Sequence, residues 1–132
     1  MENLNPITEI TEVTGIIPYP PTTNRYWITK QSRNGYSKTV TRRKEAIQYV
    51  EDVYYLIRSQ QCKALTSKHL RLELYVYPPD LKKRDLDNLC KAVLDALQRA
   101  GIYGDDFYIQ QLYLQRMEVK KHGEIKFILR SI

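Results

Sequence analysis

The sequence predicts one α+β domain in which two main helices pack on a mixed β-sheet, in the order β-α-β-α-β-β. Three kinds of pattern predict it: alternating apolar residues, two stretches with helical apolar spacing, and turn residues between them. The chain has 132 residues and 42% hydrophobic content, enough for one core without disulfide or zinc support. We assign residues 1–12 to an N-terminal extension and residues 13–132 to the domain.

The first half of the domain is predicted to contain a strand, an exposed segment and a helix. Val13–Ile17 is a β-branched run that ends at Pro18, which is typical of a strand leaving into a loop. The polar and basic stretch Ile28–Val40 has no clear period and predicts an exposed, mobile segment. From Thr41, a predicted N-cap, apolar residues recur with helical spacing to about Cys62.

The next two elements have the clearest patterns. Apolar and polar residues alternate over Leu70–Val76 and the pattern stops at Pro78, which predicts a strand with one buried face. Leucines and valine recur with helical spacing over Leu86–Leu97. Asp85 is placed to cap the start of this helix and Gly101 to end it.

Two β-rich stretches complete the chain. They follow a turn at Gly104 and run over Phe107–Val119 and Glu124–Arg130. The polar residues between them suggest that they form a terminal hairpin.

The charge balance favours an encounter with a polyanion. Lys and Arg outnumber Asp and Glu by 21 to 15, which gives a net charge of +6. Net charge alone does not identify the partner, although nucleic acid is one candidate. The first twelve residues have no signal-peptide pattern and no later run has the length of a membrane span. We therefore expect a soluble, cytoplasmic protein without a membrane partner.

The residues with the strongest chemical implication surround the start of the second helix. Lys82, Lys83 and Arg84 directly precede two carboxylates, Asp85 and Asp87. A phosphodiester hydrolase needs carboxylates to hold a hard divalent cation, and nearby cations to attract the phosphate that the carboxylates repel. The sequence supplies both within a short stretch.

More distant residues can join this cluster. Lys91 lies one helical turn beyond Asp87, and the turn at Gly104 can return Asp105 and Asp106 toward the helix start. A purely structural interpretation is also open: Asp85 as a helix cap, Asp87 with Lys91 as a solvated pair, and the later aspartates as turn residues. The residue pattern alone does not decide between them.

A family resemblance favours the chemical interpretation. The stretch from Arg84 to Leu97, followed by Ala100-Gly101-Ile102 and Asp105-Asp106, closely resembles the core motif of the RusA family of Holliday junction resolvases. The proline-rich segment from Pro18 to Tyr26 resembles that family's upstream motif. The resemblance spans roughly residues 13 to 130.

The resemblance implies a homodimeric endonuclease that uses Mg²⁺, with Mn²⁺ as a possible substitute. Such an enzyme makes paired symmetric nicks in a four-way DNA junction, in recombination and repair, within a bacterial cell or a phage-infected host. Asp85, Asp87 and Asp106 match the essential acidic residues and would bind one or two ions, and Lys91 matches the essential lysine, as a cation or a base. Supporting roles are assigned to Asp105 and Asn88.

Basic and aromatic residues on two segments are the predicted DNA contacts, although a solvated basic loop is the structural alternative. They are Asn24, Arg25, Tyr26, Trp27, Lys30, Arg33, Lys38, Arg42, Arg43, Lys82, Lys83 and Arg84. Two other functions stay open: a noncatalytic nucleic-acid-binding protein, and a less selective branched-DNA or flap nuclease with the same site.

Overall fold

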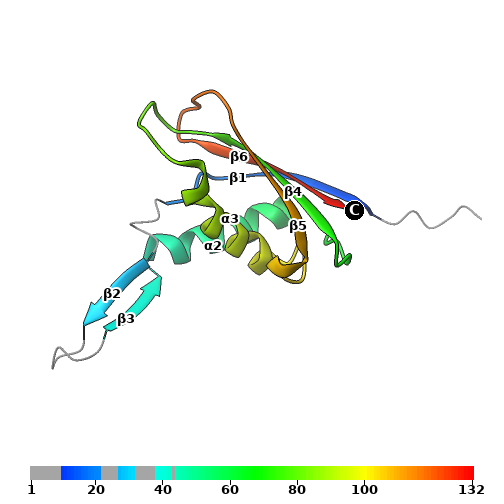
Figure 1. Ribbon diagram of the computed structural model, residues 1–132, viewed down its shortest axis with the longest axis horizontal. Helices are drawn as coiled ribbons and strands as arrows, with labels where there is room; N and C mark the ends of the chain where they lie inside the picture. The colour runs from blue at the N-terminus through cyan, green and yellow to red at the C-terminus, as the bar shows by residue number, and fades with distance from the viewer. Residues whose placement is uncertain (1–9, 22–26, 32–37, 43) are drawn as a thin grey trace, which may run out of the picture.

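A four-stranded mixed sheet carries two helices on one face (Figure 1). A computed structural model describes residues 10–21, 27–31, 38–42 and 44–132, and within 27–31 and 38–42 it describes the backbone alone. The elements are β1 (Glu12–Ile17), β2 (Trp27–Gln31), β3 (Lys38–Arg42), α2 (Lys44–Ser59), β4 (Leu70–Tyr77), the 3₁₀ turn η1 (Leu86–Leu89), α3 (Cys90–Ala100), the 3₁₀ turn η2 (Asp106–Tyr108), β5 (Ile109–Arg116) and β6 (Glu124–Ser131). The predicted α+β class and the order of the main elements are confirmed.

The order of strands in the sheet is β1-β6-β4-β5. β6 runs antiparallel to both of its neighbours, and β4 pairs in parallel with β5. The predicted terminal hairpin is therefore wrong, because β6 passes β5 and inserts between β1 and β4. The reason is burial: Ile125, Phe127 and Leu129 are completely buried, whereas most of β5 is exposed. The more apolar strand takes the central position.

The hydrophobic core lies between the sheet and the two helices. Leu70, Leu72 and Leu74 of β4 point to the helices and are completely buried. The helices supply the opposing side of the core through residues at helical spacing, chiefly Val53, Ile57, Val93, Ala96 and Leu97. This arrangement fixes the position of α3, and with it the acidic segment at its start.

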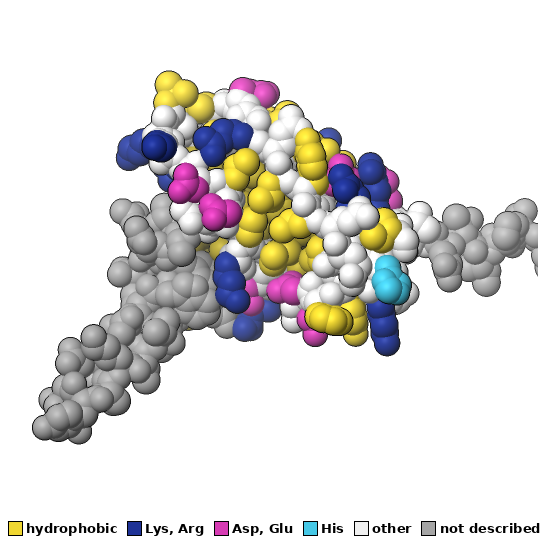
Figure 2. Space-filling view, in the orientation of Figure 1, with side chains coloured by type: hydrophobic (Ala, Val, Ile, Leu, Met, Phe, Trp, Pro, Cys, Tyr) yellow, Lys and Arg dark blue, Asp and Glu magenta, His cyan; other side chains and the backbone are white. Residues whose placement is uncertain are grey.

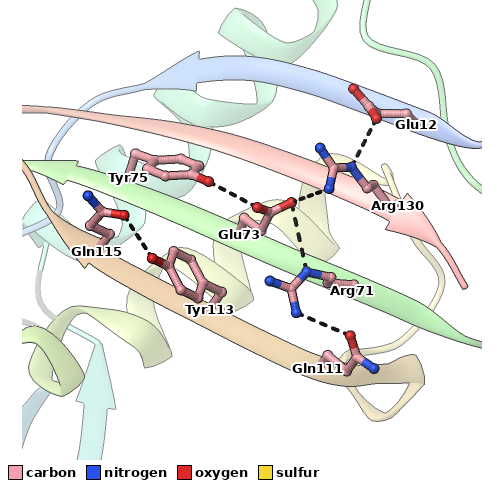
Figure 3. A network of polar contacts seen from close by, with 8 residues as sticks. All are labelled: Glu12, Arg71, Glu73, Tyr75, Gln111, Tyr113, Gln115 and Arg130. Carbon is pink, nitrogen blue, oxygen red and sulfur yellow. Dashed lines mark hydrogen bonds and ion pairs between the residues drawn. The ribbon is translucent and has the colours of Figure 1, made fainter.

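The opposite face of the sheet holds a polar network that reaches all four strands (Figure 3), since Arg71 also donates a 3.1 Å hydrogen bond to Gln111 of β5. The buried carboxylate of Glu73 lies 3.0 Å from Nη1 of Arg130 and 3.9 Å from Nε of Arg71. Tyr75 donates a 2.9 Å hydrogen bond to Glu73, and Arg130 donates a 3.0 Å bond to Glu12. A buried charge requires such pairing, so this network ties β1, β6 and β4 together.

The segment before α2 differs from its prediction. Trp27–Gln31 and Lys38–Arg42 pair as an antiparallel hairpin, which Figure 1 shows projecting from the sheet and helices. Thr41 therefore belongs to a strand and does not cap the helix, which begins at Lys44 and ends at Ser59. The β-branched and aromatic residues of this segment favour strands, but their pattern was obscured by the charged residues between them.

Other boundaries agree more closely with the sequence. α3 ends at Ala100, and Gly101 forms its C-cap with a left-handed φ of 82°, as predicted. Residues 1–9 lie outside the described part of the chain, so the assignment of an N-terminal extension stays a prediction. Among the helices that the structure describes, none combines the length and apolar composition needed to cross a membrane.

Substitution of Gly15 by alanine is expected to lower the free energy of unfolding by about 1–3 kcal/mol, because it overpacks the core. A Cβ atom at this position would lie 2.6 Å from the buried ring of Phe127. Urea denaturation measures the change. Thr14→Ala, on the exposed side of the same strand, is the control and should shift stability by less than about 0.5 kcal/mol. An unchanged unfolding midpoint for Gly15→Ala would contradict this packing.

Candidate active site

Asp85 and Asp87 lie where the loop after β4 meets the start of the second helical segment. Asp85 is the N-cap residue of η1, with an extended backbone (φ −82°, ψ 136°), and its side chain makes no capping hydrogen bond. Both residues are exposed, and within the described chain neither carboxylate has a hydrogen bond or ion pair. Asp85 therefore occupies the position of a cap without using its carboxylate as one. Both carboxylates are available to a ligand.

The loop that leads to these carboxylates is held by its own ion pair. Arg84 contacts Asp80 through two hydrogen bonds, of 2.9 and 3.3 Å, and the backbone N–H of Lys82 donates to the same carboxylate at 3.0 Å. The Arg84 bond, and then the Lys82 bond, hold the pKa of Asp80 below its usual value. Sequence analysis did not single out Asp80, although its spacing of four residues from Arg84 was a usable signal.

A contact from β5 anchors the same loop. Arg116, the last residue of β5, donates a short hydrogen bond to the backbone carbonyl of Arg84. This bond joins the end of the edge strand to the residue directly before Asp85. Of the three predicted cationic contacts in the loop, Arg84 is thus partly buried and occupied in structure, whereas Lys82 and Lys83 are exposed.

Lys91 lies in the first turn of α3 and is exposed. The surface pair with Asp87 that the purely structural interpretation requires is not formed among the described residues. The next residue on this flank, Asp95, pairs with Arg99 at 3.1 Å. Lys91 is therefore an exposed cation on α3, and it lies between the acidic pair and the later turns of that helix.

Asp105 and Asp106 are neighbours in very different surroundings. The exposed carboxylate of Asp105 accepts a 2.9 Å bond from the N–H of Phe107 and so caps η2. Asp106 is half-buried: Oδ1 accepts a 2.6 Å bond from the hydroxyl of Tyr103, and its N–H donates to Oε1 of Gln98 at 3.1 Å. Asp105 thus stabilises the start of η2, whereas Asp106 is held in place by contacts with α3 and with Tyr103 after it.

Tyr103 is the residue of this site that sequence analysis missed. Its side chain is only 2% exposed, and the hydroxyl also lies 2.9 Å from the carbonyl oxygen of Leu94. Burial, and then the bond to Asp106, raise the pKa of Tyr103 well above its ordinary value, so the hydroxyl keeps its proton near neutral pH. The shorter of its two contacts, to Asp106, is the one to which this proton is assigned.

The predicted site residues form two groups along α3. Asp85 and Asp87 precede the helix, whereas Asp106 is anchored at the level of Leu94 and Gln98, about two helical turns or on the order of 10 Å further along. Within the described chain, no three His, Cys, Asp or Glu side chains lie close enough to hold a metal ion together. The Gly104 turn returns the chain to the middle of the helix.

The donor chemistry of the first group nevertheless suits a divalent cation. Mg²⁺ binds carboxylate oxygens and usually needs only one or two of them, because water and substrate phosphates complete its shell. Asp85 and Asp87 supply two unpaired carboxylates beside exposed lysines. Figure 2 shows basic and acidic side chains around apolar surface at the end of the molecule where the loop after β4 lies.

The proposed DNA-binding arm lies mostly beyond what the structure describes. Asn24, Arg25, Tyr26, Arg33 and Arg43 are outside the described residues. Four more, Trp27, Lys30, Lys38 and Arg42, lie on β2 and β3, where the backbone alone is described. Their DNA contacts remain predictions.

Fold and site together define a class of protein. It is a basic α+β domain that presents unpaired carboxylates beside exposed cations, a set of groups that suits binding of a divalent cation next to a phosphodiester. The family model described as Endodeoxyribonuclease RusA matches residues 18–127. The chain belongs to this RusA family of endodeoxyribonucleases.

Curated relatives agree with this membership. The chain is 35% identical over 91 residues to a crossover junction endodeoxyribonuclease of Enterobacteria phage HK97, an alignment that covers 69% of this chain and 71% of the relative. It is 29% identical over 116 residues to the protein of that name from Escherichia coli strain K12, with 88% of this chain and 92% of the relative covered. The relative from Enterobacteria phage 82 gives the same identity and coverage.

The bond between Tyr103 and Asp106 is expected to contribute measurably to stability. Tyr103→Phe removes the donor and should lower the free energy of unfolding by about 1–3 kcal/mol. A double-mutant cycle with Asp106→Ala, followed by urea denaturation, isolates the pairwise contribution. Tyr108→Phe is the matched control, since its hydroxyl has no hydrogen bond within the described chain, and it should change stability little. Additive effects of the Tyr103 and Asp106 substitutions would show that the bond contributes nothing.

Proposed function

We propose that this protein is a structure-selective endonuclease that resolves four-way DNA junctions with Mg²⁺ as its cofactor and Mn²⁺ as a substitute. The observation that carries the proposal is the pair of exposed, unpaired carboxylates, Asp85 and Asp87, directly after the lysine-bearing loop. Family membership supports it, and so do the relatives' names, which specify crossover junctions. Branched DNA is thus the proposed substrate.

In this proposal Asp85 and Asp87 hold the cation, and Asp106 is the third acidic member of the site. The bound ion would lower the pKa of a water molecule and offset negative charge at the scissile phosphate. Lys91 supplies a positive charge to the phosphate from the exposed flank of α3. Asp105 positions the segment that carries Asp106 by capping η2, and Asn88, within η1, has a supporting role in this proposal.

Two like strands must be cut to resolve a junction, so a symmetric homodimer with one site per strand suits the reaction. We propose this assembly, with paired nicks, acting in recombination and repair in the cytoplasm of a bacterium or a phage-infected host. We assign the activity to the domain over residues 13–132; Glu12, placed in the preceding extension by the sequence, is already the first residue of β1.

Asp85→Asn is expected to lower junction cleavage about 100-fold or more, because it removes a carboxylate that holds the cation, while junction binding changes little. Single-turnover cleavage and an electrophoretic binding assay separate the two effects. Asp52→Asn, an exposed aspartate on α2, is the matched control and should cut normally. Undiminished cleavage by the Asp85 variant would refute the assignment.

The same assay tests the alternatives. EDTA should abolish cleavage and leave binding intact; a noncatalytic binder would show no metal-dependent cleavage at all. Comparison of a mobile four-way junction, a flap and a linear duplex in Mg²⁺ separates a resolvase from a less selective nuclease. Equal rates on the flap and the junction would contradict selectivity for junctions.

The lysines of the loop are expected to contact phosphates. Lys82→Ala combined with Lys83→Ala should weaken binding and reduce the slope of log affinity against log salt by about 2, since each lost phosphate contact removes about 0.9. Lys63→Ala with Lys68→Ala, two exposed lysines of the α2–β4 connection, is the control. Identical salt slopes for the two double variants would exclude a specific role for the loop.

A further inference from the structure

We infer that the pocket beside Asp85 receives an unstacked nucleobase of the DNA substrate. The inference rests on the proposed function and extends it to how the substrate is held. The pocket has a volume of about 430 Å³ and lies between the loop after β4 and the end of β5. This volume falls in the range of small-molecule sites, about 300–1,000 Å³.

Both walls of the pocket are held by hydrogen bonds. On one side, the pair between Asp80 and Arg84 closes the loop on itself, and Arg116 donates to the Arg84 carbonyl. On the other side, the N–H of Met117 donates to the carbonyl of Val76 at 2.8 Å, and that of Lys120 to the carbonyl of Pro78 at 2.9 Å. The pocket is therefore formed before any ligand arrives, which lowers the entropic cost of binding.

The lining suits a flat, mostly apolar ring. Its exposed area is chiefly apolar, with Leu86, Leu89 and Val119 among the aliphatic residues and Tyr19 as the aromatic one. Arg84 lies 5.8 Å from the centre of the Tyr19 ring, the arrangement of cation and aromatic ring that also favours base stacking. The carboxylate of Glu118, also in the lining, can accept a hydrogen bond from the amino group of a base.

Charge at the rim matches the DNA backbone on either side of such a base. Lys82 and Arg116 line the pocket and Lys83 is adjacent to it, so the flanking phosphates meet cations. Asp85, the proposed cation ligand, is itself part of the lining. A base in the pocket would thus place the neighbouring phosphodiester beside the proposed metal site. Unstacking costs least where base pairing is already disturbed, so the branch point is where we place the base that enters the pocket.

Photo-cross-linking tests this inference directly. The Asp85→Asn protein would be bound to four-way junctions that carry 5-iodo-2′-deoxyuridine at each position next to the cleavage site, then irradiated and mapped by mass spectrometry. We expect one position to cross-link to the peptide that contains Tyr19 or Met117. Cross-links confined to residues outside the pocket would overturn the inference.

A filled pocket provides the second arm of the test. Val119 is 41% exposed at the pocket, so Val119→Trp can fill the space without disturbing the core. We expect cross-linking to the pocket and junction cleavage each to fall ~10-fold. A change of this size is what the loss of one stacking contact between a base and an aromatic side chain produces. Ile16→Trp places the same side chain on an exposed site of β1 and should leave both unchanged.

The remaining outcomes are distinguishable. If Val119→Trp alters the oligomeric state in solution and leaves the cross-link unchanged, a second copy of the chain occupies the pocket and the inference is wrong. If the wild-type protein cuts junctions but no pocket cross-link forms, this inference alone fails. If the wild-type protein does not cut junctions at all, the proposed function fails as well.

Discussion

The insertion of β6 between β1 and β4 is the constraint on which the remaining structure depends. Its three completely buried residues, Ile125, Phe127 and Leu129, face the same core as the leucines of β4. With the centre of the sheet occupied by β6, β5 pairs at the free edge of β4, in the parallel direction. The ends of β4 and β5 then lie at the same end of the sheet, so the loop after β4 meets Arg116 and the pocket forms between them.

The loop after β4 carries both acidic and basic side chains, and only some of them pair with one another. Asp80 engages Arg84 and takes one cation out of reach of the acidic pair. Asp85 and Asp87 are left without partners in the described chain, and Lys82 and Lys83 stay exposed. Had Arg84 paired with Asp85, the site would have lost both a carboxylate and its negative potential. The pairing of Asp80 with Arg84 thus leaves the carboxylates of Asp85 and Asp87 free for a ligand.

Sequence patterns predicted those features that depend on local chemistry. The alternation over Leu70–Val76, the stripe of α3 and the end of that helix at Gly101 all follow from burial periodicity and backbone preference. The order of the strands could not be predicted from these patterns, because the same alternation of apolar residues fits either neighbouring strand. The choice between a terminal hairpin and the insertion of β6 depends on the total area that each strand buries. Tyr103 was missed for a similar reason: nothing local indicates that its hydroxyl reaches Asp106.

The two acidic groups along α3 differ in what holds them, and this difference indicates which group can move. Asp106 is fixed through its carboxylate by a buried hydroxyl and through its backbone by Gln98, so displacement would break two hydrogen bonds and expose Tyr103. Asp85 and Asp87 are exposed on a short 3₁₀ turn, and their side chains make no such bonds within the described chain. These side chains can change rotamer without breaking a hydrogen bond, whereas the backbone before Asp85 is anchored by Arg116 and by the pair of Arg84 with Asp80. If one cation is to be shared between the groups, the carboxylates at the mouth of α3 must approach Asp106, with Lys91 in the turn between them.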